Sequence, residues 1–176
     1  KINKSKINIV CVGRLLPYKG HETILKAIEI VAKKHNVALF IAGDGILFSH
    51  IKHLAKKLHL EKHVKLLGNV SNIPSLLSEM DIFVNGSTWE GMSNAVLEGM
   101  CAELPSVVIN APGVTECHQN LKTGFVINGN SIMMANKIEK LINNKKLRLQ
   151  MGSLAKKRIQ ERFSITENRF QFINLY

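Results

Sequence analysis

Cysteine and aromatic residues are scarce in this sequence of 176 residues, and no apolar run approaches the length of a membrane span. The three cysteines are odd in number and scattered, so we expect reduced thiols and no disulfide. Aromatic residues make up 6% of the chain and no RNA- or DNA-binding motif occurs, which disfavours nucleic acid as a partner. Because no signal-peptide pattern opens the chain either, we expect a cytoplasmic protein.

Hydrophobic residues make up 45% of the chain and charged residues 21%, a balance typical of a folded globular domain. At this length, one domain can bury a sizeable core without disulfides or metals. Residues 1–6 are polar and basic and lack an initiator Met, so we interpret them as a linker remnant of a longer protein. Residues 7–176 are then the domain.

The net charge of +11 comes from clustered lysines, which most simply form solvated helix faces. The functional alternative is attraction to an anionic membrane leaflet. A metal site could be imagined from His50, His53, His59 and His63. These histidines lie among lysines without a carboxylate or thiol at ligand spacing, so we predict surface histidines and no metal.

Apolar runs and helical periodicity alternate along the chain, which predicts a parallel sheet with helices on both faces. The predicted strands are residues 7–12, 37–42, 64–67, 82–84, 106–109 and 125–127. The predicted helices are residues 21–34, 47–58, 73–78, 93–104, 131–143, 145–161 and 165–176. The fold class is therefore α/β, a three-layer Rossmann-like domain.

The central stretch is residues 81–105, DIFVNGSTWEGMSNAVLEGMCAELP, which gives a strand, a polar loop and a helix. Ser93 or Asn94 can cap that helix. Such a loop lies at the carboxyl edge of an open parallel sheet, where ligands bind. The backbone N–H groups from Gly91 to Asn94 would then form an anion site.

Two carboxylates, Glu90 and Glu98, frame this loop. Carboxylates over a groove suit sugar or ribose hydroxyl groups, which are neutral donors. The same pair is also typical of a solvated helix start, where acidic residues stabilise the helix dipole. Spacing alone favours the second interpretation.

A second polar loop, V-G-R-L-L-P-Y-K-G, follows the first strand and carries Arg14 and Lys19. Arg supplies a planar fork and Lys a point charge, a combination that suits a diphosphate. Exposed loop cations are otherwise usually just solvated. The later turn Gly43-Asp44-Gly45 lacks the G-x-G-x-x-G spacing of a dinucleotide fingerprint, which removes the main support for hydride transfer.

Together, E-G-M-S-N-A-V-L-E-G-M and G-R-L-L-P-Y-K-G resemble the E-x7-E and G-R-x(n)-K-G hallmarks of retaining GT-B glycosyltransferases, the group related to glycogen and sucrose synthases. The resemblance spans residues 7 to about 163 and implies the carboxy-terminal, nucleotide-sugar-binding half of that fold. It implies that Arg14 and Lys19, in the loop opened by Gly13, clamp the donor diphosphate. Glu90 would contact the transferred sugar and Glu98 the ribose.

The resemblance also assigns backbone roles. The amides of Gly91, Met92, Ser93 and Asn94 would face the sugar and diphosphate, and the main chain of Val70 would contact the nucleobase. Ser93 and Gly99 depart from residues common in the family, which puts sugar specificity in doubt.

Three further residues are weaker candidates. Glu116 matches a family loop glutamate, but a capping role is at least as plausible. Cys117 and His118 are adjacent in sequence, which does not create the side-chain geometry of a nucleophile and its base.

On this resemblance the chain is the donor-binding half of a hexosyltransferase of bacterial surface polysaccharide synthesis, which moves a sugar from a nucleotide-diphosphate sugar to a glycan or lipid-linked acceptor. No metal or other cofactor is expected. The partners are the nucleotide sugar, the missing amino-terminal acceptor domain and an anionic inner membrane face. The chain alone should transfer nothing. The alternatives are a GT-B nucleotide-sugar epimerase and a basic membrane- or nucleic-acid-docking module without activity.

Overall fold

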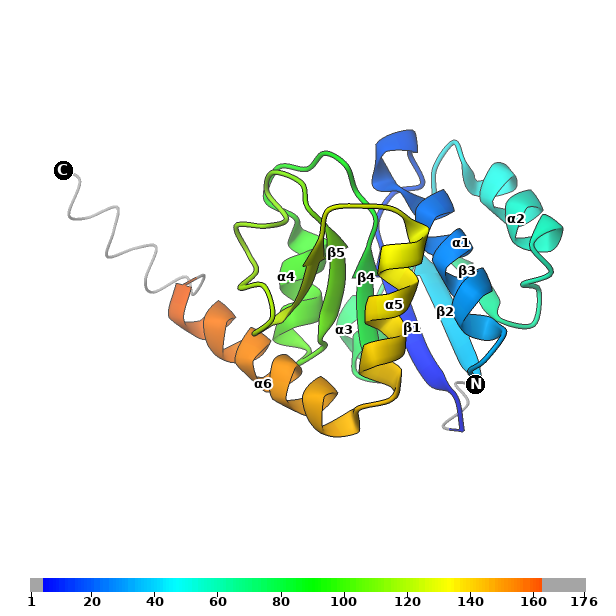
Figure 1. The fold of residues 1–176 in the computed structure, drawn as a ribbon. Coiled ribbons are helices and arrows are strands. Elements are labelled where there is room, and N and C mark those ends of the chain that lie inside the picture. The colour runs from blue at the N-terminus through cyan, green and yellow to red at the C-terminus, as the bar shows by residue number, and fades with distance from the viewer. Residues whose placement is uncertain (1–4, 163–176) are drawn as a thin grey trace.

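The computed structural model describes residues 5–162 and contains a six-stranded sheet flanked by helices (Figure 1). The strands are β1 (Ile7–Val12), β2 (Val37–Ala42), β3 (Val64–Gly68), β4 (Ile82–Asn85), β5 (Ser106–Ile109) and β6 (Gly124–Ile127). The helices are α1 (His21–Ala32), α2 (Phe48–Lys57), α3 (Ile73–Leu77), α4 (Asn94–Cys101), α5 (Ser131–Ile142) and α6 (Lys145–Arg162), with a 3-10 turn, η1, at Pro17–Lys19.

The strand order is β3-β2-β1-β4-β5-β6, and every neighbouring pair is parallel. The chain therefore reverses its direction of winding between β1 and β4, which pair through Ile9–Ile82 and Val10–Phe83. In open sheets of this kind, ligands bind beyond the carboxyl ends of the strands at such a reversal. The loops after β1 and β4 lie together at that edge, at the top of Figure 1.

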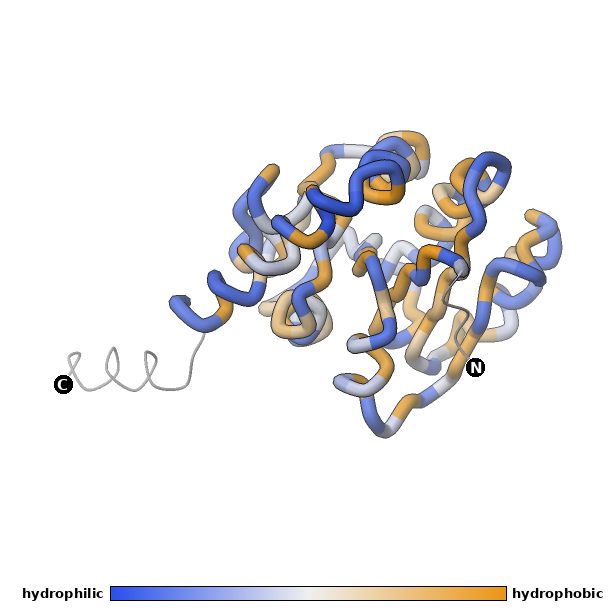
Figure 2. The backbone as a smooth tube through the Cα atoms, turned by 90° about the horizontal axis from the view of Figure 1, so that it is seen from below, coloured by the Kyte–Doolittle hydropathy of each residue, from blue (hydrophilic) through white to orange (hydrophobic). Residues whose placement is uncertain are grey.

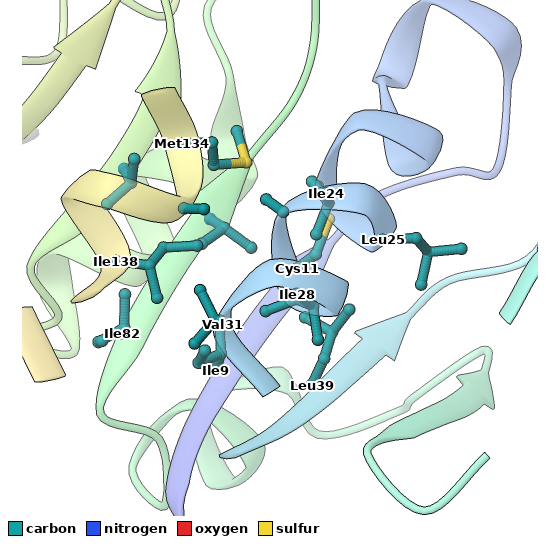
Figure 3. Close-up of a cluster of buried hydrophobic side chains, with 14 of the residues drawn as sticks. Ile9, Cys11, Ile24, Leu25, Ile28, Val31, Leu39, Ile82, Met134 and Ile138 are labelled. Atoms are coloured by element: carbon teal, nitrogen blue, oxygen red, sulfur yellow. The ribbon is translucent and has the colours of Figure 1, made fainter. Parts of the chain in front are cut away.

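Two apolar cores cover the two faces of the sheet. One joins the sheet to α1, α2 and α5, and Figure 3 shows its centre, where Ile24 and Ile28 of α1 pack with Met134 and Ile138 of α5. The other joins the opposite face to α3, α4 and α6. Burying each such side chain stabilises the fold by roughly 1.5–3 kcal/mol. Hydrophobic residues concentrate along the central strands, and hydrophilic ones along the outer helices (Figure 2).

The expected three-layer parallel α/β architecture is confirmed. Element boundaries differ from the predictions by a few residues: α4 ends at Cys101 rather than at residue 104, and α1 at Ala32 rather than at residue 34. The predicted helix at 165–176 and most of the predicted linker lie outside the described residues. Within the described part of the chain, no helix is both long and apolar enough to span a membrane.

The structure explains the glycine at position 99, where the sequence departs from the residue common in the family it resembles. A Cβ atom at this position would lie 2.7 Å from a ring carbon of Phe83. Glycine therefore lets α4 approach β4 closely, over a phenyl ring that is itself fully buried. Since α4 carries Glu98, this contact fixes how far that side chain stands from the sheet edge.

Candidate functional site

The loops after β1 and β4 are in direct backbone contact. Gly20 has φ +66, and a Cβ atom there would lie 1.9 Å from the carbonyl oxygen of Gly86. The reverse holds too, since a Cβ on Gly86 would lie 2.5 Å from the oxygen of Gly20. The backbone N–H of Thr88 donates to the carbonyl of Tyr18 at 2.9 Å. Only glycine permits so close an approach, which brings two sequence-distant motifs to one place.

Lys19 and Glu90 form an ion pair at this junction. The Nζ–Oε1 distance is 2.7 Å, and the side chains are 17% and 10% exposed. The hydroxyl of Ser87 donates to the same Oε1 at 2.7 Å. The basic residue predicted to bind diphosphate and the acidic residue predicted to bind sugar are thus neighbours.

Two buried titratable side chains near this ion pair, Cys11 and His21, are uncharged. Burial raises the pKa of the Cys11 thiol to about 12, a shift that Lys19 opposes and Glu90 reinforces. Burial and the nearby Lys19 lower the pKa of His21 to about 4. Both groups are neutral at pH 7, and buried neutral surroundings of this kind strengthen the attraction between the charges of Lys19 and Glu90. The ring nitrogens of His21, which is 2% exposed, have no hydrogen-bond partner among the described residues.

Arg14 lies in the same loop as Lys19 but is exposed. Among residues 5–162 its guanidinium takes part in no ion pair or hydrogen bond. Gly13 before it has φ +152, and a Cβ atom there would meet no atom within 4 Å. The end of β1 therefore opens onto free space beside an unpaired cation.

The segment predicted to offer backbone amides leads into α4, whose N-cap is Ser93 without a side-chain capping bond. Gly91, Met92 and Asn94 are exposed and Ser93 is buried. A Cβ atom on Gly113, which has φ +74, would lie 1.6 Å from the carbonyl oxygen of Gly91. The loop after β5 thus packs directly against this segment.

The buried thiol of Cys117 belongs to the same support. It donates to the carbonyl of Gly113 at 3.4 Å. Burial and Glu116 raise its pKa, whereas Arg158 and a hydrogen bond from the backbone N–H of Ser93 lower it. Cys117 therefore lies against the segment that leads into α4, at Ser93.

Glu98 is exposed on α4 and lines a groove of about 480 Å³ between α3 and α4. Asn94 and Leu97 of α4 and Pro74 of α3 also line it. Val70 lies between β3 and α3, and its main chain makes no hydrogen bond within the described residues. The structure thus leaves Glu98 and the backbone of Val70 free for a ligand at the same edge of the sheet.

The remaining candidates have structural partners. The turn at Asp44 supports the first loop, because its carbonyl accepts from the N–H of Leu15 at 2.9 Å. His118 lies within 3.4 Å of the Ser106 hydroxyl and 3.2 Å of the Thr123 hydroxyl, so its ring is held away from nucleophilic chemistry with Cys117.

Two features of the site escaped sequence reasoning. The contact between the Ser87 hydroxyl and Glu90 could have been suspected from their spacing of three residues, S-T-W-E, which suits a local side-chain hydrogen bond. The contacts of Gly20 with Gly86 and of Gly113 with Gly91 join distant segments, and no local pattern signals them.

These observations define a class of protein. It is a Rossmann-like domain that carries a paired and an unpaired cation, a partly buried carboxylate and a helix start at the carboxyl edge of β1 and β4. The sequence matches the family described as Glycosyl transferases group 1 over residues 1–158. The chain belongs to that family, and its fold is the carboxy-terminal half of the GT-B architecture.

Individual relatives agree with this assignment. The chain is 34% identical over 147 residues to an uncharacterized glycosyltransferase of Haemophilus influenzae, covering 82% of this chain and 42% of the relative. It is 34% identical over 157 residues to the capsular polysaccharide biosynthesis glycosyltransferase CapM of Staphylococcus aureus, covering 87% of this chain and 41% of CapM.

A crystal structure of a TarM variant from S. aureus, in complex with fondaparinux, alpha-GlcNAc-glycerol and UDP, superposes with a TM-score of 0.92 at 28% identity. The match covers 99% of this chain and 36% of TarM. The chain thus spans less than half the length of each of these relatives.

Proposed function

We propose that this chain binds the donor in a retaining glycosyltransferase that moves a hexose-type sugar from a nucleotide-diphosphate sugar to a glycan or lipid-linked acceptor. The observation that carries the proposal is the 2.7 Å pairing of Lys19 with Glu90 beside the unpaired Arg14. A diphosphate needs cations and a sugar needs hydrogen-bond acceptors, and this edge offers both within one junction.

Each group has a role in the proposed complex. Arg14 and Lys19 bind the diphosphate and stabilise it as it leaves with the electrons of the broken glycosidic bond. The exposed amides of the segment before α4 add partial positive charge at the helix start. Glu90 accepts from sugar hydroxyl groups and Glu98 from the ribose. Fixed donors aimed at a developing charge supply much of the rate in such reactions, and in this arrangement no metal is required.

The acceptor side of the reaction is proposed to come from an amino-terminal domain of the same protein. The relatives are more than twice as long as their matched part, which leaves room for such a domain. The similarity to CapM, a glycosyltransferase of capsular polysaccharide biosynthesis, supports a role in bacterial surface glycans. The isolated chain then lacks one wall of the cleft and transfers no sugar, so turnover by this chain alone would contradict the proposed division.

Titration of UDP, GDP and ADP into the chain by isothermal calorimetry tests donor binding. One nucleotide is expected to bind, and Arg14→Ala is expected to weaken it by about 10- to 100-fold, the value of a charge-assisted hydrogen bond of ~1.5–3 kcal/mol. Lys62→Ala is the control, since it removes the same charge from an exposed position just before β3, at the opposite edge of the sheet. Equal weakening by both variants would indicate general charge attraction rather than a site.

Contact with an anionic membrane face is a second, peripheral proposal. Lys145 and Lys146 begin α6, are exposed and form no ion pair within residues 5–162, and Leu149 one turn later is 65% exposed. Each lysine near an anionic surface contributes ~1 kcal/mol. Replacing both by alanine is expected to weaken sedimentation with phosphatidylglycerol vesicles by about 30-fold, with no effect on weak binding to phosphatidylcholine vesicles. Unchanged sedimentation would exclude this helix as the contact.

A further inference from the structure

The two carboxylate oxygens of Glu90 have different surroundings. Oε1 accepts from Lys19 Nζ and from the Ser87 hydroxyl, each at 2.7 Å. Among residues 5–162, no donor reaches Oε2. The terminal torsion of a glutamate is broad and nearly two-fold, so an unheld carboxylate presents either oxygen. Two donors on one oxygen remove that equivalence.

We propose that Ser87 is a positioning residue, which together with Lys19 holds Oε1 so that Glu90 meets a hydroxyl group of the donor sugar through Oε2. This inference rests on the proposed function of Glu90 and adds a residue that touches neither sugar nor nucleotide. Ser87 acts only through the carboxylate.

Ser87 is itself rigidly placed. It is 1% exposed, and its backbone N–H donates to the side-chain carbonyl oxygen of Asn85, the last residue of β4, at 2.8 Å. The hydroxyl is thus fixed to the end of a central strand rather than to a free loop. Because a well-packed donor loses little entropy when it bonds, such a group orients a carboxylate more effectively than a mobile side chain does.

Lys19 completes the arrangement. An ammonium group has three N–H donors, and its bond to Glu90 uses one. The remaining two point away from the carboxylate and can serve phosphate oxygens. Lys19 therefore links the sugar-binding carboxylate to the diphosphate site, and Ser87 fixes the carboxylate end of this link.

A merely structural role would differ in one respect. The pattern S-x-x-E is also that of a capping box, but no helix starts at Ser87, since α4 begins at Asn94. If the hydroxyl only supported the loop, its loss would affect binding of nucleotide and of nucleotide sugar alike. If it orients Glu90, its loss reduces only the additional affinity that the sugar provides.

The experiment measures that additional affinity by calorimetry with matched ligands: UDP and UDP-glucose, GDP and GDP-mannose, and ADP and ADP-glucose. The pair with the tightest nucleotide is used for the variants. Ser87→Ala is expected to bind the nucleotide like the wild type and to lose about five-fold in affinity for the nucleotide sugar, the effect of one net hydrogen bond. Ser87→Thr keeps the hydroxyl and is expected to retain most of that affinity. Ser153→Ala removes an exposed hydroxyl of α6, far from Glu90 and without a hydrogen bond among the described residues, and is expected to change neither.

Each result decides between the possibilities, provided that thermal melting shows the variants folded. Equal losses for nucleotide and nucleotide sugar in Ser87→Ala would overturn the positioning role, and so would an unchanged nucleotide-sugar affinity. Ser87→Thr that melts like the wild type but binds like Ser87→Ala would exclude the hydroxyl as the active group. A wild type whose nucleotide sugar binds no better than its nucleotide would refute the Oε2 contact. No binding of any nucleotide would instead refute the proposed function itself.

Discussion

Replacing Gly20 by alanine should separate the two loops that form the site. The variant acquires two penalties. A left-handed backbone at φ +66 is unfavourable for alanine by roughly 1–2 kcal/mol. The new Cβ atom would also lie 1.9 Å from the carbonyl oxygen of Gly86, so the loops must move apart by about 1 Å, and overpacking of this kind costs about 1–3 kcal/mol.

Gly68→Ala provides a matched control. Gly68 has φ +63, nearly the same backbone conformation, but a Cβ atom there meets nothing within 4 Å. It should therefore lose only the conformational part, ~1–2 kcal/mol, against ~2–5 kcal/mol for Gly20→Ala. The difference isolates the contact with Gly86.

Urea denaturation followed by circular dichroism measures both free energies of unfolding. At this chain length, each kcal/mol also lowers the melting temperature by about 2–4 °C. Since Gly20 directly follows Lys19, the displaced loop should loosen the Lys19–Glu90 pair and weaken nucleotide-sugar binding in calorimetry. Equal stability losses in the two variants, or a Gly20→Ala protein with wild-type affinity for nucleotide sugar, would refute the argument that this glycine contact assembles the site.

Three further outcomes are expected. Glu98→Gln removes the charge of the proposed ribose acceptor and should weaken nucleoside diphosphate binding by about ten-fold while leaving inorganic diphosphate unaffected, as competition calorimetry can measure. His118 has its pKa lowered to about 4 by burial and by Arg158, so the unfolded chain binds the extra proton and stability falls as the pH drops from 6.5 towards 4. The full loss from His118 is roughly 3 kcal/mol. Urea titrations at pH 7 and pH 5 should show a smaller loss of stability in His118→Gln than in the wild type, and the remainder comes from His21, whose pKa is also lowered to about 4; an equal loss in both proteins would contradict the assignment. The exposed thiol of Cys101 should react with a disulfide reagent at pH 8 in the folded protein. Buried Cys11, with its pKa raised to about 12, should react only after unfolding. Labelling kinetics measure this order, with Cys101→Ser as the control that should lose the fast reaction, and labelling of Cys11 before Cys101 would contradict the prediction.

Local patterns in the sequence were enough for the layers of the fold and for the edge of the sheet at which the candidate site lies. The run Ile7–Val12 is apolar except for Asn8 because β1 is buried on both faces, and α1 repeats apolar residues at helical spacing because only one side of it meets the sheet. Arg14, Lys19 and Glu90 each follow a strand by a few residues, so parallel strands place them all at the carboxyl edge.

The exact ends of helices and the contacts between distant loops could not be predicted from the sequence. The sequence continues α4 to residue 104 because its apolar spacing persists, whereas the helix ends at Cys101 and Glu103 adopts φ +60. The Gly113–Gly91 contact and the bond from the Cys117 thiol to the Gly113 carbonyl depend on where the loop after β5 lies. Local propensity does not encode such placements, since they follow from the packing of whole elements.

The sequence by itself determined the alternation of strands and helices, the parallel sheet and the residue types at its carboxyl edge, because each is a matter of local periodicity and of direction along the chain. Only the tertiary structure decided that β1 lies beside β4, and that Lys19 and Glu90, 71 residues apart, meet at 2.7 Å on one carboxylate oxygen. The physical reason is that strand order and close glycine contacts depend on the energy of the whole packed domain.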